Sequence, residues 1–442
     1  MASASVSPLL NLQIELQLEI ASYLKTTPAW QQDLCSWSSV CSHFRTLLTP
    51  FLFDSITLRN TEKSGDSVAR LSKSRFARYI RTFHFLGNAP GDTEDAFTDV
   101  GAIFPKIVEE IIADLTRFPN LETVQIEFEM DFDSDWEEGF MLFQDTESPE
   151  EREQAEQKEA WRALNTNVYK ALARNIDPKF TKLHLIDLIP AEASAFSTVQ
   201  FQTLLCNLTS FELSCWTSDG GDYSANTRLG YVMFLDKLDS LFFDHLSSLT
   251  DLIIDARDLP VSFRSYQLAE SQRLNRTRIP LLKNIHLTSL FITRGLIYLM
   301  ATQAHCLEKV HLEDCHAGRA YVGDDISCWW DDLFDAIADK NPNKLYEFDV
   351  FPSSGFELFD DYHSSRAEKE EAARALVTLQ ESPHLRLFSY SYIDDKYGFV
   401  GSIEESNLAS FRVGKDQRAY DRLCRIVAQN ARKKAVTGDH TS

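Results

Sequence analysis

Five histidine and cysteine residues lie close together in one short stretch of the sequence, and side chains of these types are the usual ligands of zinc. They are His305, Cys306, His311, Cys315 and His316. The chain contains no C-x-x-C pair and no H-E-x-x-H helix. The apolar pattern around the cluster predicts that His311 lies on the outer face of a strand and that Cys315 points into the core. Two side chains that point to opposite sides are poorly placed to share one tetrahedral site. The sequence therefore predicts no metal site and no cofactor.

Catalytic signatures were also sought. The chain has no G-x-S-x-G elbow, no G-x-x-x-x-G-K-[ST] phosphate loop and no G-x-G-x-x-G turn. Acidic pairs such as Asp331-Asp332 occur, but acidic residues near helix starts are explained by capping and the helix dipole. We therefore expect no catalytic residues and a protein that acts by binding, not as an enzyme.

One apolar pattern recurs from residue 53 onward. Each copy is apolar at its first, fourth and sixth positions, and the last two apolar residues alternate as in a strand with one buried face. The copies are Phe53-Ile56-Leu58, Ile80-Phe83-Phe85, Leu121-Val124-Ile126, Phe180-Leu183-Leu185, Leu208-Phe211-Leu213, Leu249-Leu252-Ile254, Leu282-Ile285-Leu287, Leu307-Val310-Leu312, Leu345-Phe348-Val350 and, more weakly, Leu385-Phe388-Tyr390. Helical patterns lie between them. A strand and a helix repeated along a chain is the arrangement of leucine-rich repeats.

The clearest copy is LEKVHLEDC, from Leu307 to Cys315, which matches the L-x-x-L-x-L-x-x-N/C signature with one valine for leucine. The copies are about 37 residues apart on average, above the usual 20 to 29. We therefore predict an α/β fold with an irregular leucine-rich-repeat-like solenoid of parallel strands and helices. The alternative is an ordinary α/β domain with helices around a parallel sheet. Only the solenoid predicts ten similar triplets.

Four histidines occupy equivalent positions of this repeat. The residue between the two alternating apolar positions points away from the core. In order along the chain these positions hold Thr57, His84, Gln125, His184, Glu212, Ile253, His286, His311, Asp349 and Ser389. Because neighbouring strands are about 4.8 Å apart, His286 and His311 are expected side by side. We predict that the four histidines belong to a surface that binds a target, with a pH sensitivity since histidine titrates near neutrality. The alternative is that a polar strand face simply tolerates histidine.

The N-terminal stretch from Leu12 to Phe53 is apolar at helical spacing. Leu16, Ile20, Tyr23 and Leu24 share one helical face. The two or three short helices of this stretch are too few to bury a good core alone. They therefore need the rest of the chain, and in part another protein, to pack against.

This stretch resembles an F-box. The pattern is Leu12, Glu15-Leu16, Ile20, Leu24, Asp33-Leu34, Val40-Cys41, Phe44-Arg45, Leu47 and Pro50. In that family three helices dock on the Skp-type linker of cullin-based ubiquitin ligases, and an F-box before a leucine-rich solenoid is similar to many fungal members. The resemblance implies a linker contact by Leu12, Gln13, Leu16, Ile20, Leu24, Leu34, Val40, Cys41 and Phe44. It departs from the family at Gln13, where a proline is usual, and this implies weaker docking.

Charge and composition narrow the class of partner. The net charge of −22 argues against nucleic acid and anionic membranes as partners, because both are themselves negative.

The start of the chain lacks the features of a signal peptide, and no stretch is apolar enough to span a membrane. Eight cysteines in apolar company, without C-x-x-C pairs, indicate reduced core residues of an intracellular protein, cytoplasmic or nuclear.

The predicted organisation is an F-box-like helical domain over residues 1–52 and the solenoid over residues 53–442. Residues 129–160 form an acidic insertion of net charge −11, which is typical of a solvated, flexible loop. The functional hypothesis is a substrate-recognition subunit of a Skp–cullin–F-box ubiquitin ligase that binds the linker, through it a cullin, and a protein substrate. The alternative is an interaction scaffold outside any ligase, whose N-terminal helices only cap the solenoid.

Overall fold

Nine parallel strands form one sheet in which spatial order follows chain order, β1-β2-β3-β4-β5-β6-β7-β8-β10. The computed structural model describes residues 8–438, apart from 26, 28, 91–102, 132–147, 217–228, 257–278, 320–327, 352–364, 383 and 395–399. The strands of the sheet are β1 (Ser55–Arg59), β2 (Thr82–Pro90), β3 (Thr123–Asp131), β4 (Lys182–Leu188), β5 (Ser210–Cys215), β6 (Asp251–Asp255), β7 (Asn284–Thr288), β8 (Lys309–Glu313) and β10 (Glu347–Phe351). This confirms the predicted α/β class with parallel strands.

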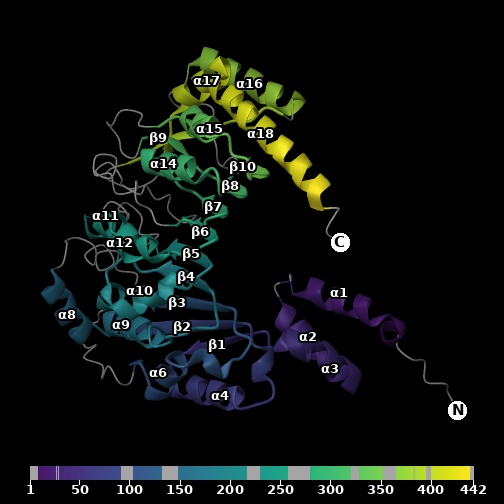
Figure 1. The fold of residues 1–442 in the computed structure, drawn as a ribbon, viewed down its shortest axis with the longest axis vertical. Helices are drawn as coiled ribbons and strands as arrows, with labels where there is room; N and C mark the ends of the chain where they lie inside the picture. Colours follow the sequence, from purple (N-terminus) through teal and green to yellow (C-terminus); the bar gives the residue numbers. More distant parts are fainter. Residues whose placement is uncertain are drawn as a thin grey trace.

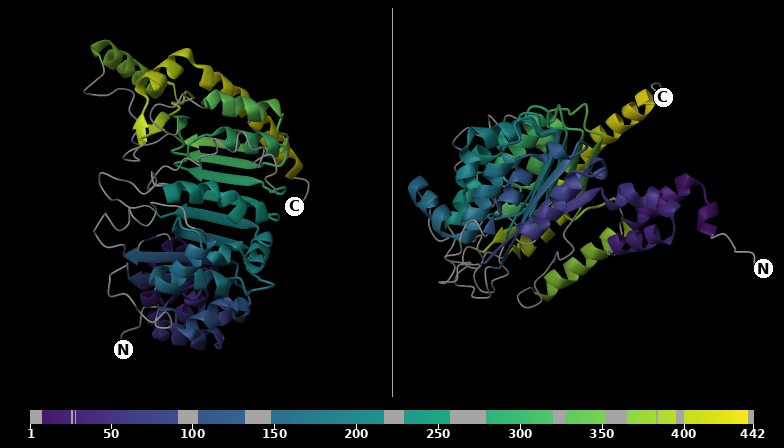
Figure 2. Two further views of the ribbon diagram at one scale, coloured as in Figure 1. Left: turned by 90° about the vertical axis from the view of Figure 1, so that its left-hand side faces the viewer. Right: turned by 90° about the horizontal axis from the view of Figure 1, so that it is seen from below.

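Helices follow most of the strands and lie along one face of the sheet (Figures 1 and 2). They are α4 (Glu62–Ser72), α6 (Lys106–Ile112), α8 (Pro149–Lys158), α9 (Ala160–Leu172), α10 (Val199–Cys206), α11 (Leu229–Asp236), α12 (Leu238–Leu241), α14 (Arg294–Gln303) and α15 (Trp330–Asp339). Because the described crossover helices fall on one side and the strand order never reverses, the arrangement is solenoid-like and not doubly wound. In Figure 1 no described helix covers the middle strands on the opposite side.

The nine clear apolar triplets pair in one common register across the sheet. Ile56 faces Phe83 at one end, and Val310 faces Phe348 at the other. The same backbone contact repeats before each strand: the Asp54 carbonyl accepts the N–H groups of Arg81 and Thr82, at 2.8 and 3.0 Å. The same pair of hydrogen bonds forms at the start of each later strand, with the carbonyl that directly precedes the neighbouring strand as the acceptor. The last acceptor in this series is the carbonyl of Glu308. A repeated apolar pattern therefore produces a repeated hydrogen-bond pattern.

The tenth triplet does not join this sheet, and its prediction was wrong. Tyr390 starts β11 (Tyr390–Ile393), which pairs with β9 (Ala317–Arg319) and β12 (Val400–Ser402) in a separate three-stranded sheet. Ser389, predicted to point outward, is 2% exposed. Its carbonyl accepts the N–H of Ala317, 2.9 Å away. The outward column of residues therefore ends at Asp349.

Several strands end in a turn with left-handed backbone. Asp187, Ser289 and Asp314 each stand two positions after the last apolar residue of their triplet, with φ of 49°, 57° and 52°. Asp187 lies in the irregular end of β4, and Ser289 and Asp314 directly follow β7 and β8. Asp and Ser tolerate this conformation better than branched residues do. The turn after β8 directs Cys315 inward as predicted: it is buried, and its thiol donates to the Leu287 carbonyl at 3.5 Å.

The N-terminal residues form three helices with a small core of their own. These are α1 (Ile14–Leu24), α2 (Trp30–Val40) and α3 (Ser42–Leu52), and Figure 1 shows them beside the β1 end of the sheet. Two contacts mark the junction with the sheet. The Phe53 ring stacks on that of Phe76, with centroids 4.6 Å apart, and the Lys25 ammonium pairs with the Asp54 carboxylate at 2.7 Å. Only two residues separate α3 from β1, so no long linker intervenes.

Three C-terminal helices cover the far end of the sheet. They are α16 (Arg366–Glu381), α17 (Glu404–Val413) and α18 (Lys415–Gly438). Tyr420 of α18 contacts the rings of Phe334 and Phe348, at centroid distances of 5.3 and 6.3 Å. The side-chain amide of Asn430 donates to the carbonyls of Pro342 and Leu345. These contacts agree with the terminal cap that a solenoid needs.

Part of the acidic insertion is a structured helix. Residues 132–147 lie outside the described part of the chain, whereas α8 begins with a capping box between Ser148 and Glu151. The guanidinium of Arg152 then pairs with Glu192 at 2.8 Å, and Glu156 accepts hydrogen bonds from Ser194. The charged end of the insertion therefore docks on the repeat.

The prediction that the cysteines are core residues holds only in part. Cys315 and Cys328 are buried, Cys35 is exposed, and the other five are intermediate. The physical reason is that a small thiol is tolerated at the edges of helices and strands as well as in a core.

His316 links the two sheets and gives a pH-dependent prediction. Its ring is 8% exposed, and Nδ1 lies 3.1 Å from the Ser391 hydroxyl. Burial lowers the pKa of His316 from 6.5 to about 4. Between these values the unfolded chain binds a proton that the folded chain does not, so stability falls as the pH drops through this window. We expect this residue to account for a loss of about 2 kcal/mol between neutral pH and about pH 4.5.

Urea unfolding at both pH values measures this loss, with His316→Asn as the comparison because its amide does not titrate. The variant should lose about 2 kcal/mol less than the unchanged chain over the same interval. Equal losses in the two proteins would contradict the assignment.

Candidate functional site

The N-terminal helices present an apolar surface to solvent. Of the eighteen large apolar residues that are exposed in the described part of the chain, seven fall within the first 40 positions: Leu9, Leu10, Ile14, Leu16, Ile20, Tyr23 and Val40. Leu16 is 45% exposed, Ile20 36% and Tyr23 73%. Side chains of α1 therefore form an apolar face that the described residues leave open to solvent, which is typical of an interaction site.

The predicted linker-contact residues divide into two groups. Gln13, Leu16, Ile20 and Val40 are exposed, and Leu12, Leu24 and Cys41 are partly exposed. Leu34 and Phe44, in contrast, are 0% and 1% exposed. They form the centre of the three-helix core with Ala21 and Leu48, so they hold the helices together and have no surface to offer a partner.

Gln13 stands at the N-cap of α1 in a conformation that suits proline. Its φ of −58° and ψ of 147° lie in the polyproline region, and proline fixes φ near −65°. Its side chain makes no capping hydrogen bond. The backbone angles of Gln13 are therefore ones that a proline could also adopt.

The second predicted surface is the outward column of the sheet, and all four of its histidines lie there. His84 pairs with Gln125 in register, and Gln125 with His184. The Nε2 atom of His84 lies 2.8 Å from the Glu127 carboxylate, and that of His184 lies 3.4 Å from Glu212. Their side chains are 20% exposed, so the rings are largely covered by neighbours on the strand face.

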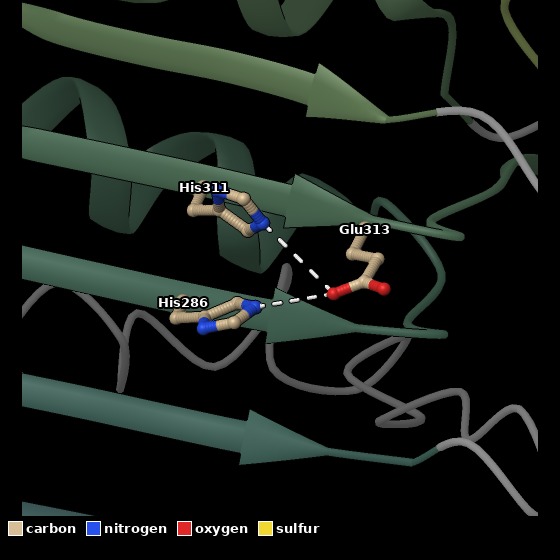
Figure 3. A group of neighbouring side chains, drawn as sticks. All are labelled: His286, His311 and Glu313. Carbon is tan, nitrogen blue, oxygen red and sulfur yellow. Dashed lines mark ion pairs between the residues drawn. The ribbon is translucent and has the colours of Figure 1, made fainter. Parts of the chain in front are cut away.

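His286 and His311 are side by side, as predicted. They pair in register on β7 and β8, and their ring centroids are 4.3 Å apart at 71°. Figure 3 shows that both rings present a nitrogen to Glu313. Sequence reasoning missed this glutamate. The signal was available, because a residue two positions after His311 on a strand must share its face.

The prediction that these histidines titrate near neutrality is wrong for His184. Burial, followed by the neighbouring charge of His84, lowers the pKa of His184 to about 4. Burial also raises the pKa of Glu212. His184 is therefore neutral at physiological pH and cannot act as a charge switch there. The physical reason is desolvation by the sheet face, which the sequence alone does not show.

The other four members of the histidine and cysteine cluster do not gather at His311, and His305 is exposed. His316 and Cys315 are buried behind the turn after β8, and the Cys306 thiol lies 3.8 Å from the Pro280 carbonyl, near the start of the strand. The predicted separation of His311 from Cys315 is confirmed. Proximity in the sequence therefore does not bring these five side chains together in space.

An apolar hollow of about 90 Å³ lies between the sheet and the helices near α12 and α14. Leu238, Phe243, Leu252 and Leu296 are among the residues that line it, with Asp236, Asp239 and Thr293 as the polar members. Burial, with the charges of Asp244 and Asp236, raises the pKa of Asp239 to about 6. The lining suits an apolar group and holds no nucleophile paired with a base.

No protein-family model matches the chain, and a search of curated proteins gives no match. The class of protein is therefore defined by the fold: an α/β protein on one sequentially ordered parallel sheet, with three N-terminal helices and a helical C-terminal cap. None of the described helices is both long enough and apolar enough to cross a membrane.

Proposed function

We propose that this protein is a substrate-recognition subunit of a Skp–cullin–F-box ubiquitin ligase. In this proposal α1 to α3 dock on the Skp-type linker, and the uncovered face of a leucine-rich-repeat-like solenoid binds the protein target. The chain itself performs no chemistry. It raises the effective concentration of the target at the ligase, which acts through the linker and cullin.

The exposed apolar face of α1 carries the proposal. Leu16 and Ile20 are one turn apart and both open to solvent, so a partner can bury them together. Full burial of such side chains contributes about 1.5–3 kcal/mol each. The backbone of Gln13 has dihedral angles that proline also adopts, so the substituted position is compatible with the motif that this stretch resembles.

The alternative, a scaffold whose N-terminal helices only cap the solenoid, fits the packing less well. A cap would bury its apolar residues against β1 and α4. The buried residues Ala21, Leu34, Phe44 and Leu48 instead form a cluster separate from the main core. Ile14, Leu16 and Ile20 of α1 are exposed, which favours a second protein as their partner.

Co-purification with a recombinant Skp-type linker tests the proposal. The intact chain should bind, and the double variant Leu16→Asp, Ile20→Asp should bind at least ~100-fold more weakly, since about 1.4 kcal/mol corresponds to each factor of ten. Both positions are exposed, so the thermal unfolding temperature of the variant should match that of the intact chain.

A matched control uses the same substitution at exposed apolar positions elsewhere. Ile176 and Val199 are 83% and 73% exposed and belong to the solenoid. Ile176→Asp, Val199→Asp should leave linker binding unchanged. If the intact chain does not bind the linker, the receptor proposal fails and the scaffold alternative replaces it.

A further inference from the structure

Three side chains that can ligate a metal meet on β7 and β8, on the sheet face opposite the described crossover helices. Nε2 of His286 lies 3.6 Å from Oε2 of Glu313, and Nε2 of His311 lies 3.9 Å from the same oxygen. The three donor atoms all lie within 4.8 Å of one another (Figure 3). Among the residues that the structure describes, this is the only group of three or more such donors at this spacing.

The spacing is close to that of a tetrahedral zinc site. Zinc bonds of about 2.0–2.2 Å to nitrogen and oxygen keep neighbouring ligands roughly 3.3–3.5 Å apart. The two histidine–glutamate distances exceed the lower value by about 0.6 Å or less. The third separation, between the two histidine nitrogens, is no more than 4.8 Å, so binding would draw all three donors together by side-chain rotation.

The backbone holds the three ligands in place. His286 and His311 are register partners in a parallel ladder, and Glu313 follows His311 by two residues on the same strand face. Ligands on hydrogen-bonded strands are positioned more firmly than ligands on loops. The Phe351 ring lies 4.7 Å from that of His311 and packs beside the group.

The charge state also suits a metal ion. A metal ion binds a neutral imidazole through its nitrogen lone pair, and His286 and His311 each direct Nε2 toward the Glu313 carboxylate. Glu313 supplies a negative charge directly, and Asp255 acts on His286 electrostatically from the adjacent strand. Asp349 is the register partner of His311 on the other side. A divalent cation would therefore enter a site with acidic neighbours on both flanking strands.

We propose that His286, His311 and Glu313 bind a divalent transition-metal ion, zinc above all, through two imidazole nitrogens and one carboxylate. Two histidines and a glutamate are a ligand set that zinc uses where one coordination position stays open. The side chains are 36%, 35% and 39% exposed, so an ion can enter from solvent and keep a water molecule as its fourth ligand. The proposal goes beyond the ligase function and does not depend on it.

Titration of the full, chelator-stripped chain with Zn²⁺ and with Co²⁺ tests this site. We expect one ion bound per chain in the micromolar range or tighter. The Co²⁺ absorption spectrum should show nitrogen and oxygen coordination without the charge-transfer band of a cysteine thiolate. His286→Ala and His311→Ala should each lower affinity at least ~100-fold, because losing even an outer-shell partner costs about 10–100-fold. Glu313→Gln should also weaken binding.

His84→Ala is the matched control, since His84 also pairs with a glutamate on this face but belongs to no such three-donor group. It should leave the affinity unchanged, and the thermal unfolding temperatures of the metal-free variants should agree with that of the intact chain. Absence of stoichiometric binding overturns the proposal. So does equal binding by the double variant His286→Ala, His311→Ala, or a thiolate band in the Co²⁺ spectrum that this double variant retains.

Discussion

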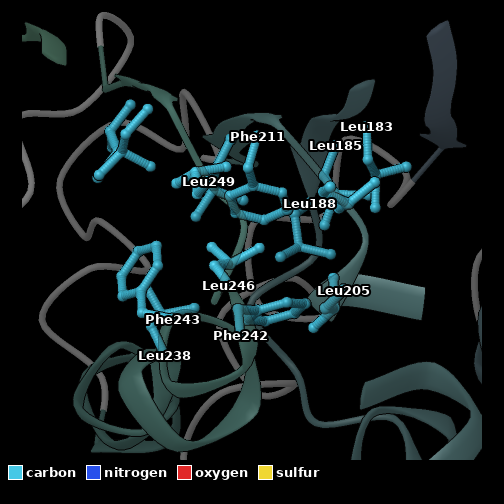
Figure 4. Packing of buried hydrophobic residues seen from close by; sticks show 14 of the residues in the cluster. Leu183, Leu185, Leu188, Leu205, Phe211, Leu238, Phe242, Phe243, Leu246 and Leu249 are labelled. Atoms are coloured by element: carbon cyan, nitrogen blue, oxygen red, sulfur yellow. The ribbon is translucent and has the colours of Figure 1, made fainter. Parts of the chain in front are cut away.

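Replacing Phe242 by alanine is expected to lower the free energy of unfolding by about 3–5 kcal/mol, the usual cost of removing a buried phenylalanine. Phe242 is fully buried, and it contacts the rings of Phe196 and Phe211 at centroid distances of 5.0 and 5.9 Å. Figure 4 shows it next to Leu205 and Leu246. Its removal leaves a cavity that rings held from several sides cannot fill.

Denaturant unfolding followed by circular dichroism measures this effect. Tyr298→Ala serves as the control, because Tyr298 is an aromatic residue of α14 that is 42% exposed. The control should change stability by much less than the Phe242 variant does. A loss below about 1 kcal/mol for Phe242→Ala would show that this part of the core is not packed as described.

The second large effect is expected for Asp416→Ala, with a loss of about 3–5 kcal/mol. Asp416 is 3% exposed at the start of α18. Its carboxylate accepts the Asp331 backbone N–H at 3.1 Å, the Tyr390 hydroxyl at 2.9 Å and the Ser410 hydroxyl. Alanine would leave these buried donors without their acceptor, and each such group costs about 1–3 kcal/mol.

The measured quantity is again the free energy of unfolding, together with proteolysis of the C-terminal helices. Asp416→Asn should lose less, because the amide keeps one acceptor oxygen. Asp421→Ala, at an exposed position of the same helix, should stay within about 0.5 kcal/mol of the intact chain. Equal behaviour of the variants at 416 and 421 would contradict a structural role for the buried carboxylate.

Phe242 and Asp416 stabilise the parts of the fold that hold the histidine column in place. Phe242 packs under the middle strands, and Asp416 joins α15, β11, α17 and α18 at the end of the sheet. The ring contact between Phe351 and His311 lies on the last two strands of that sheet. A loosened cap is therefore expected to disturb this end of the histidine column before the end near His84.

The sequence by itself determined the strands of the main sheet and their faces. An alternation of apolar residues fixes which side of a strand is buried, and a repeated triplet fixes the common register, because a slip by one residue would expose every apolar side chain. That is why nine triplets, and the adjacency of His286 and His311, followed from residue order alone.

Only the tertiary structure decided which elements contact one another over long distances. Tyr390 carries the right local pattern, yet its strand pairs with β9 because the three-stranded sheet competes with the main sheet for its backbone groups. Leu16 and Leu34 are equally apolar, but the packing of the three helices buries Leu34 and leaves Leu16 exposed. Glu313 meets two histidines from neighbouring strands, and desolvation by that same face moves the pKa of His184. The burial of a side chain, and its contacts with side chains of other strands, depend on neighbours that are distant in the sequence. The local periodicity of apolar residues contains no information about those neighbours.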